Sequence, residues 1–307
     1  MRNDLAVAGL ISNWTFETCF VSRWERRKAV EVMFRNVHRR PQYKKIKGVT
    51  HQRTWVVYFM YSPDGQMSSS QVFTLTRLRA MGLPIFVVCA TPSPEQLPHG
   101  ISEYCEALYW KGMAGYDFSG YTLGLLEISR NSPGADVFVM NDSVFGPFCD
   151  LREVIAQAPW DLTGFTASNQ VTNHIQSYAF IIRAVNKKRM AKLSTVFFPY
   201  IALSNMSAVV ALQETRLARV ASRHMTVGAL WYGDKKEVID PTLVRPLELL
   251  DVGFPFLKRS LLGKHQSFID ADLMYTRLQQ FGHPIDGVSD QKVSGSTGVQ
   301  SAAKNPA

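Results

Sequence analysis

The chain has 307 residues, 46% of them hydrophobic, which is typical of a globular protein with a sizeable core and excludes a wholly disordered chain. Its net charge of +9 is concentrated in residues 23–47, which hold ten Lys and Arg against two Glu, while the rest of the chain is nearly neutral. The four cysteines have neither the close pairing of a disulfide framework nor the spacing of a zinc site, which fits a reducing cytosolic compartment.

The basic segment contains apolar residues between its charges, Trp24 and Phe34 among them. This mixture suits an anionic bilayer surface, although a solvated basic helix has the same composition. Nucleic acid would attract the same charges, but the near-neutral remainder of the chain argues against it. No stretch of eighteen apolar residues and no export signal is recognised. We therefore predict a cytoplasmic protein, peripheral on the inner face of the plasma membrane through residues 1–47.

The next elements predict a parallel sheet. Residues 54–61 form an apolar, β-rich run that ends in the turn sequence Ser62-Pro63-Asp64-Gly65. A helix is expected from Ser69 to Met81, followed by a second strand at 84–90. Strand, helix and strand in this order are the unit of a parallel sheet.

The stretch from Ala135 to Phe148 begins as a buried strand and then becomes abruptly polar at Asn141-Asp142-Ser143. Open α/β sheets bind ligands at the carboxyl ends of their strands, so these three residues are candidate ligand-binding groups. The alternative is that they are ordinary turn formers that hydrogen-bond their own backbone.

The second half of the chain is expected to contain a short strand at 160–166 and a longer one at 174–182. Alternation would place His174, Gln176 and Tyr178 on one face of that strand. Helices are expected from there to about residue 230. Residues 286–307 are rich in Gly, Ser, Ala and Lys, which predicts a disordered tail after a catalytic domain at 48–285.

Six short motifs in this order resemble the rhamnan synthesis protein F family of bacterial glycosyltransferases. They are Tyr61-Ser62-Pro63-Asp64-Gly65, Gly115-Tyr116-Asp117-Phe118-Ser119-Gly120-Tyr121, Val139-Met140-Asn141-Asp142-Ser143-Val144-Phe145-Gly146-Pro147, Leu162-Thr163-Gly164-Phe165-Thr166-Ala167-Ser168, His174-Ile175-Gln176-Ser177-Tyr178, and Gly253-Phe254-Pro255-Phe256-Leu257-Lys258-Arg259 with Leu261-Leu262. The resemblance implies an α/β, GT-A-like (Rossmann-like) fold whose mostly parallel sheet is flanked by helices, with a helical C-terminal portion. It also implies transfer of a sugar, rhamnose in that family, from a nucleotide-sugar donor to a polysaccharide or a polyprenyl-linked acceptor.

For such a reaction, the donor's diphosphate must be neutralised by a divalent metal or by cations. Asp142 is the candidate ligand for Mg²⁺ or Mn²⁺, although Asn141-Asp142-Ser143 offers one carboxylate in place of the Asp-x-Asp common in GT-A enzymes. Asp117 is a candidate for donor hydroxyl groups, or else the cap of a helix. Asp64 would border the nucleotide pocket, or else only form a turn.

Transfer with inversion also needs a general base, for which Asp161 and Glu214 are the candidates. Asp161 lies beside a tryptophan but could equally end a turn, and Glu214 could be a solvated residue paired with arginine. We expect His174 and Gln176 to orient sugar hydroxyl groups, although a lone histidine is often structural. A non-catalytic partner in polysaccharide assembly is the alternative function, favoured by the single carboxylate at Asp142.

Overall fold

The computed structural model describes residues 10–11, 14–16, 23–168, 172–233 and 240–285. The expected disordered tail at 286–307 lies outside the described residues.

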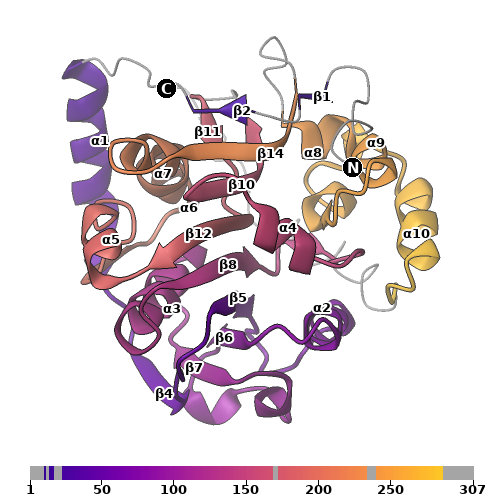
Figure 1. The fold of residues 1–307 in the computed structure, drawn as a ribbon, viewed down its shortest axis with the longest axis horizontal. Helices are drawn as coiled ribbons and strands as arrows, with labels where there is room; N and C mark the ends of the chain where they lie inside the picture. Colours follow the sequence, from indigo (N-terminus) through magenta and orange to yellow (C-terminus); the bar gives the residue numbers. More distant parts are fainter. Residues whose placement is uncertain (1–9, 12–13, 17–22, 169–171, 234–239, 286–307) are drawn as a thin grey trace, which may run out of the picture.

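A large mixed sheet forms the centre of the molecule (Figure 1), with the strand order β1-β14-β10-β12-β8-β5-β6-β7-β4. The strands along this path are β1 (Leu10–Ile11), β14 (Val227–Gly233), β10 (Leu162–Ser168), β12 (Ala179–Val185), β8 (Ala135–Asn141), β5 (Thr54–Tyr61), β6 (Ile85–Ala90), β7 (Ala107–Lys111) and β4 (Tyr43–Lys47). The strands β8, β5, β6 and β7 are parallel to one another, and β12 is antiparallel to both of its neighbours. Two further short strands join this sheet: β11 (His174–Ile175) pairs with β10, and β2 (Trp14–Thr15) pairs with β14.

Helices cover both faces of this sheet, which confirms the expected α/β fold class (Figure 1). Val57 and Phe59 of β5 pack in the core under α3 (Asp117–Asn131), α5 (Lys187–Lys192) and α7 (Thr215–Ala221). Val56 and Tyr58 pack in the opposite core, under α2 (Ser69–Ala80) and α4 (Arg152–Gln157). Both faces of the strand are buried, so β5 is apolar throughout instead of alternating.

Two glycines allow α3 to approach the sheet closely. A Cβ atom at Gly120 would lie 2.3 Å from the ring of Phe59, and one at Gly124 would lie 2.8 Å from Val57. Any side chain at either position would push the helix away from β5. The glycines therefore fix the position of the first residue of α3, Asp117.

The second half of the chain differs from the sequence-based expectation in two places. The strand expected at 174–182 is divided into β11 and β12, because the chain turns at Gln176–Tyr178 between them. The helical region expected up to residue 230 contains β13 (Ile201–Leu203) and the first half of β14. Strand β14 forms because β10 offers it a parallel pairing partner, a tertiary contact that local sequence does not reveal.

The basic segment is partly integrated into this domain. After α1 (Arg23–Asn36), strand β3 (Val37–Arg39) pairs with β13, and β4 pairs with β7 at the edge of the main sheet. The boundary expected at residue 48 thus falls between two strands of a single sheet. On α1, Val30 and Phe34 are 51% and 73% exposed, and the expected contact with an anionic bilayer stays a prediction. Within the described ranges, every helix is too short or too polar to cross a membrane.

The C-terminal portion is mainly helical and has a small core of its own. It contains α8 (Pro241–Val244), α9 (Pro246–Asp251) and α10 (Ala271–Gln280). Its one strand, β15 (Leu257–Lys258), pairs with β9 (Val144–Phe145), which directly follows the carboxyl end of β8. This pairing brings the basic residues that follow β15 to the end of the central sheet.

Candidate functional site

A cleft of about 910 Å³ lies outside the carboxyl ends of β5 and β8. At this point the sheet order reverses, because β6 and β7 follow on one side of β5 and β8 lies on the other. Open α/β sheets bind ligands at such switch points. The described residues that line the cleft include most of those predicted from the sequence: Asp64, Asp117, Asn141, Asp142, Ser143, Gln176 and Glu214.

Asp142, which lines the cleft, is held by donors from two other elements. Its Oδ2 accepts hydrogen bonds from the backbone N–H of Tyr61, at 2.9 Å, and from Nε2 of Gln71, at 2.8 Å. Burial raises the pKa of its carboxyl group, and these donors together with the charge of Arg259 oppose the rise. The carboxylate thus ties the end of β8 to the end of β5 and the first turn of α2.

Gln71 is a site residue that our sequence analysis missed. Its Oε1 accepts a hydrogen bond from the backbone N–H of Ser68, and the hydroxyl of Ser68 accepts one from the backbone N–H of Gln71. This reciprocal pair is a capping box at the start of α2. The sequence contained the pattern of a capping box, a serine (Ser68) followed three residues later by a glutamine (Gln71). Sequence spacing identifies the cap but not the further bond to Asp142, because that residue is 71 positions away.

Asp117 and Asn141 form a second polar group in the cleft. Nδ2 of Asn141 donates to Oδ2 of Asp117 at 2.8 Å, and Oδ1 of Asn141 accepts from the backbone N–H and the hydroxyl of Ser143. Burial, followed by the negative charge of Glu214, raises the pKa of Asp117 to about 7. Near neutral pH this carboxyl group can therefore donate as well as accept hydrogen bonds.

Lys111 fixes the loop that leads to Asp117. Its ammonium group is buried and donates to the carbonyl oxygens of Gly112, Ala114 and Gly115, at 2.9, 2.9 and 3.0 Å. Burial lowers its pKa to about 8. Because all three acceptors precede α3, the lysine acts as a positioning residue for the helix start.

Glu214 reaches the cleft from a π-helical turn at residues 210–214, between α6 (Met206–Val209) and α7. Its Oε1 accepts from the backbone N–H of Ser177 at 3.2 Å. Single π-turns within helices are frequent at functional sites, because the extra residue re-aims the side chains that follow. Here it directs a carboxylate into the same space as Asp117, and the two charges interact.

Cationic residues of β15 and of the segment that follows it line the same cleft: Lys258, Arg259 and Lys264, together with His265. Nζ of Lys258 donates to Oδ2 of Asp240, at 2.5 Å, and to Oε1 of Gln176, at 3.3 Å. Nη1 of Arg259 donates to the carbonyl oxygen of Asp142, at 3.2 Å. Lys264 is exposed. One cleft therefore contains both a set of carboxylates and a set of cations.

Asp64 lines the cleft and also stabilises a turn, which was the alternative role that its sequence allowed. Its Oδ1 accepts from the backbone N–H of Gln66 at 3.0 Å and from the hydroxyl of Ser62 at 3.5 Å. These bonds stabilise the turn after β5, while the exposed side chain still borders the cleft.

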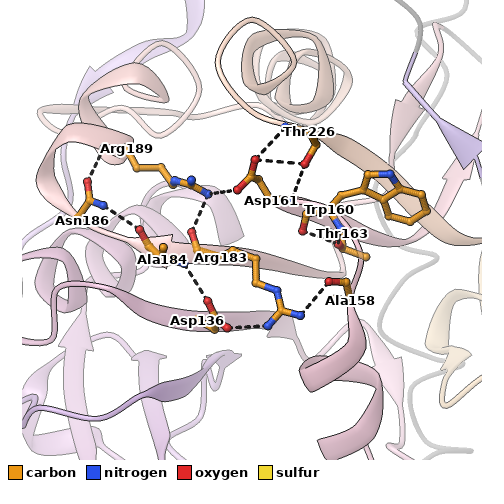
Figure 2. A network of polar contacts seen from close by, with 10 residues as sticks. All are labelled: Asp136, Ala158, Trp160, Asp161, Thr163, Arg183, Ala184, Asn186, Arg189 and Thr226. Carbon is orange, nitrogen blue, oxygen red and sulfur yellow. Dashed lines mark hydrogen bonds and ion pairs between the residues drawn. The ribbon is translucent and has the colours of Figure 1, made fainter.

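Asp161 directly precedes β10, at the amino end of that strand (Figure 2). Its Oδ1 accepts from Nη1 of Arg189 at 3.0 Å, and its Oδ2 accepts from the backbone N–H and hydroxyl of Thr226 at 3.0 and 3.1 Å. The neighbouring Arg183 pairs with Asp136 at 2.6 Å. Because both carboxylate oxygens are engaged and the residue does not line the cleft, we do not include Asp161 in the proposed site.

Asp161→Asn is expected to lower the free energy of unfolding by about 1–3 kcal/mol, because the charged hydrogen bonds to Arg189 and Thr226 weaken. The rate of any transfer reaction, per folded molecule, should stay unchanged. Urea unfolding and an activity assay check the two parts. Asp150→Asn, at an exposed ion pair with Arg152, is the matched control and should change stability by less than about 0.5 kcal/mol. A large loss of rate in folded Asp161→Asn would restore Asp161 as a base.

His174 and Gln176 are separated by the structure. Gln176 lines the cleft and accepts from Lys258. His174 is 4% exposed and does not line the cleft, and its Nδ1 is 2.6 Å from the carbonyl oxygen of Thr172. The structural alternative for the histidine therefore fits its position, whereas Gln176 stays available to a ligand.

The described residues do not form a preassembled metal site. No group of three or more His, Cys, Asp or Glu side chains in the described ranges is placed to hold a metal ion. Oδ2 of Asp142, the candidate ligand, already accepts two hydrogen bonds. A requirement for Mg²⁺ or Mn²⁺ stays a prediction.

Comparison with known proteins does not assign a family to this chain. No protein-family model matches it. It is 31% identical over 132 residues to the uncharacterized protein y4gN of Sinorhizobium fredii, a match that covers 40% of this chain and 34% of that protein. The chain thus spans about a third of the length of this relative. Membership of the rhamnan synthesis protein F family stays a prediction.

Some solved structures resemble this chain distantly in fold. They include TarS (residues 1–349) from S. aureus, with a TM-score of 0.37 and 12% identity over 65% of this chain and 63% of that one. The 4-diphosphocytidyl-2C-methyl-D-erythritol synthase from Anaerococcus prevotii has a TM-score of 0.36 and 10% identity, over 66% of this chain and 98% of that one. The inositol-1-phosphate CTP transferase from T. maritima has a TM-score of 0.33 and 10% identity, over 66% and 97%.

Proposed function

We propose that this chain is a glycosyltransferase that takes a sugar from a nucleotide-sugar donor and adds it to a polysaccharide or lipid-linked glycan. The observation that carries the proposal is the composition of the cleft at the switch point. The carboxylates of Asp117, Asp142 and Glu214 line it together with the cations of Arg259 and Lys264. A nucleotide sugar needs both kinds of group, because its diphosphate is anionic and its sugar and ribose are rich in hydroxyl groups. That the sugar is rhamnose rests on the resemblance of the sequence motifs alone.

In this proposal, the cations bind the diphosphate and stabilise the negative charge that develops on it as the bond to the sugar breaks. Asp117 and Asn141 hydrogen-bond sugar or ribose hydroxyl groups, and Gln176 orients the acceptor side. Glu214 removes the proton from the acceptor hydroxyl as its oxygen bonds to the anomeric carbon, for a transfer with inversion. Asp142 holds β5, β8 and α2 together around the donor.

Calorimetric titration with a panel of nucleoside diphosphates and nucleotide sugars, with and without Mg²⁺ or Mn²⁺, tests this function. At least one nucleotide sugar is expected to bind, and Asp142→Ala is expected to weaken that binding at least tenfold, since Asp142 organises the cleft floor. Asp150→Ala, on the surface, is the matched control. If no nucleotide binds in any condition, the donor site is refuted and the non-catalytic assembly partner becomes the better interpretation.

A further inference from the structure

A second cavity, here called the edge pocket, lies at the outer edge of the sheet, where β4 begins and β7 ends. Its volume is about 740 Å³. The described residues that line it are Arg39, Arg40, Pro41, Gln42, Tyr43, Lys44, Pro94, Trp110 and Tyr200. Its described lining shares no residue with that of the cleft, and the mechanism proposed above uses none of its residues.

The edge pocket is cationic. Arg39, Arg40 and Lys44 line it, and the described lining includes no Asp or Glu. Glu95 follows the lining residue Pro94, and its charge interacts with that of Lys44. A cluster of three cations with one carboxylate nearby favours an anionic ligand.

The edge pocket also presents an exposed aromatic side chain, carried on a hydrogen-bonded backbone. Tyr200 is 79% exposed. Its carbonyl oxygen accepts from the backbone N–H of Arg40 at 3.0 Å, and the guanidinium of Arg40 donates to the preceding carbonyl, of Pro199, at 2.9 Å. The same guanidinium lies 4.5 Å from the centre of the Tyr43 ring. Arg40 thus fixes the backbone that carries the exposed ring.

The edge pocket and the cleft lie on the same side of the sheet, where β5, β6 and β7 have their carboxyl ends and the antiparallel β4 has its amino end. The strand register places Tyr61 opposite Ala90, Ala90 opposite Lys111, and Lys111 opposite Tyr43. Tyr61 lines the cleft and Tyr43 lines the edge pocket. Three strand spacings, about 14 Å, separate these two lining residues along the sheet, a span within reach of one short oligomer.

We propose that the edge pocket binds an anionic oligosaccharide, as an anchor for the acceptor of the transfer reaction. The carboxylates or phosphates of such a glycan would pair with Arg39 and Lys44, and the apolar face of a sugar ring would pack on Tyr200. The acceptor role rests on the glycosyltransferase function proposed above, whereas binding to the pocket does not.

A nucleic acid is the less suitable anion, because the next two lysines along β4 have protein partners. Lys45 lies 3.5 Å from Glu127, and the ammonium of Lys47 donates to the carbonyl oxygen of Cys105 at 2.5 Å. A polynucleotide needs a longer track of available cations for its regularly spaced phosphates. The cations that line the edge pocket instead lie in a hollow beside the exposed ring of Tyr200.

The test is calorimetric titration of the full chain with pentagalacturonate, with neutral maltopentaose as the matched probe. We expect pentagalacturonate to bind at least tenfold more tightly than maltopentaose. Tyr200→Ala and Arg39→Ala should each weaken binding at least fivefold, whereas Arg27→Ala, at an exposed position of α1, should leave it unchanged. No binding of pentagalacturonate, or equal binding by the wild type and both pocket variants, would overturn the proposal. So would tighter pocket-dependent binding of a thymidine pentanucleotide.

The same variants separate this proposal from the proposed function. Tyr200→Ala should bind a nucleotide sugar as the wild type does, and Asp142→Ala should bind pentagalacturonate as the wild type does, because the two sites share no lining residue. If pentagalacturonate binds but no nucleotide sugar does, the pocket is retained and the transferase function is rejected.

Discussion

Glu214→Gln is expected to lower the rate of sugar transfer by about 10²–10⁴-fold, because an amide cannot remove the proton from the attacking hydroxyl group. The amide oxygen can still accept the hydrogen bond from Ser177, so the fold of the cleft should persist. Donor affinity should stay within about threefold of the wild type, since the proton transfer contributes only in the transition state. The loss should therefore appear in kcat and not in the donor dissociation constant.

The rate is measured as release of nucleoside diphosphate from the nucleotide sugar that the titration identifies. Water takes the place of the acceptor in this assay. Glu153→Gln, at an exposed position of α4, is the matched control and should leave the rate unchanged. If Glu214→Gln retains the wild-type rate while its donor binding is intact, another group is the base.

Asp117→Asn is expected to remove a strong pH dependence of stability. The pKa of Asp117 is about 7 in the folded protein, against 3.8 for an unperturbed aspartate, so the folded state binds more protons between these values. The free energy of unfolding should therefore decrease as the pH rises from about 4 to 7, by at most about 1.4 kcal/mol per pH unit. The stability from this group is fully present below the unfolded pKa and lost above the folded one.

Urea unfolding of the wild type and the variant between pH 4.5 and 8 measures this slope. An asparagine at position 117 can still accept the hydrogen bond from Asn141 but cannot ionise, so the variant should gain stability relative to the wild type as the pH rises. Asp64→Asn, at an exposed carboxylate of the same cleft, should keep the wild-type slope. Parallel curves for the wild type and Asp117→Asn would contradict a raised pKa.

Local sequence was sufficient where an element is long and buried on both faces. The expected strands at 54–61 and 84–90 and the helix at 69–81 correspond to β5, β6 and α2 to within one residue at every end. Local sequence was insufficient to predict β14, or to predict that β11 and β12 are separate strands. Those elements depend on pairing with β10, which lies far from β14 in the chain.

The candidate site shows the same contrast. Asn141 and Asp142 were recognisable because polar residues end a buried strand, and the sheet places that end at the cleft. Asp161 and Glu214 were indistinguishable as candidate bases, because each is a single acidic residue without a motif. The structure places Asp161 at the amino end of β10 and brings Glu214 beside Asp117.

The sequence by itself determined the α/β class, the order of the first strands and helices, and the polar tip of β8, because apolar runs and turn residues act over a few neighbouring positions. Only the tertiary structure decided that Glu214 shares a cleft with Asp117 and that Lys258 pairs with Asp240. It also decided that Arg39, Arg40 and Tyr200 surround one pocket. These residues meet through strand pairing and helix packing across long chain distances, and such contacts leave no local pattern in the sequence.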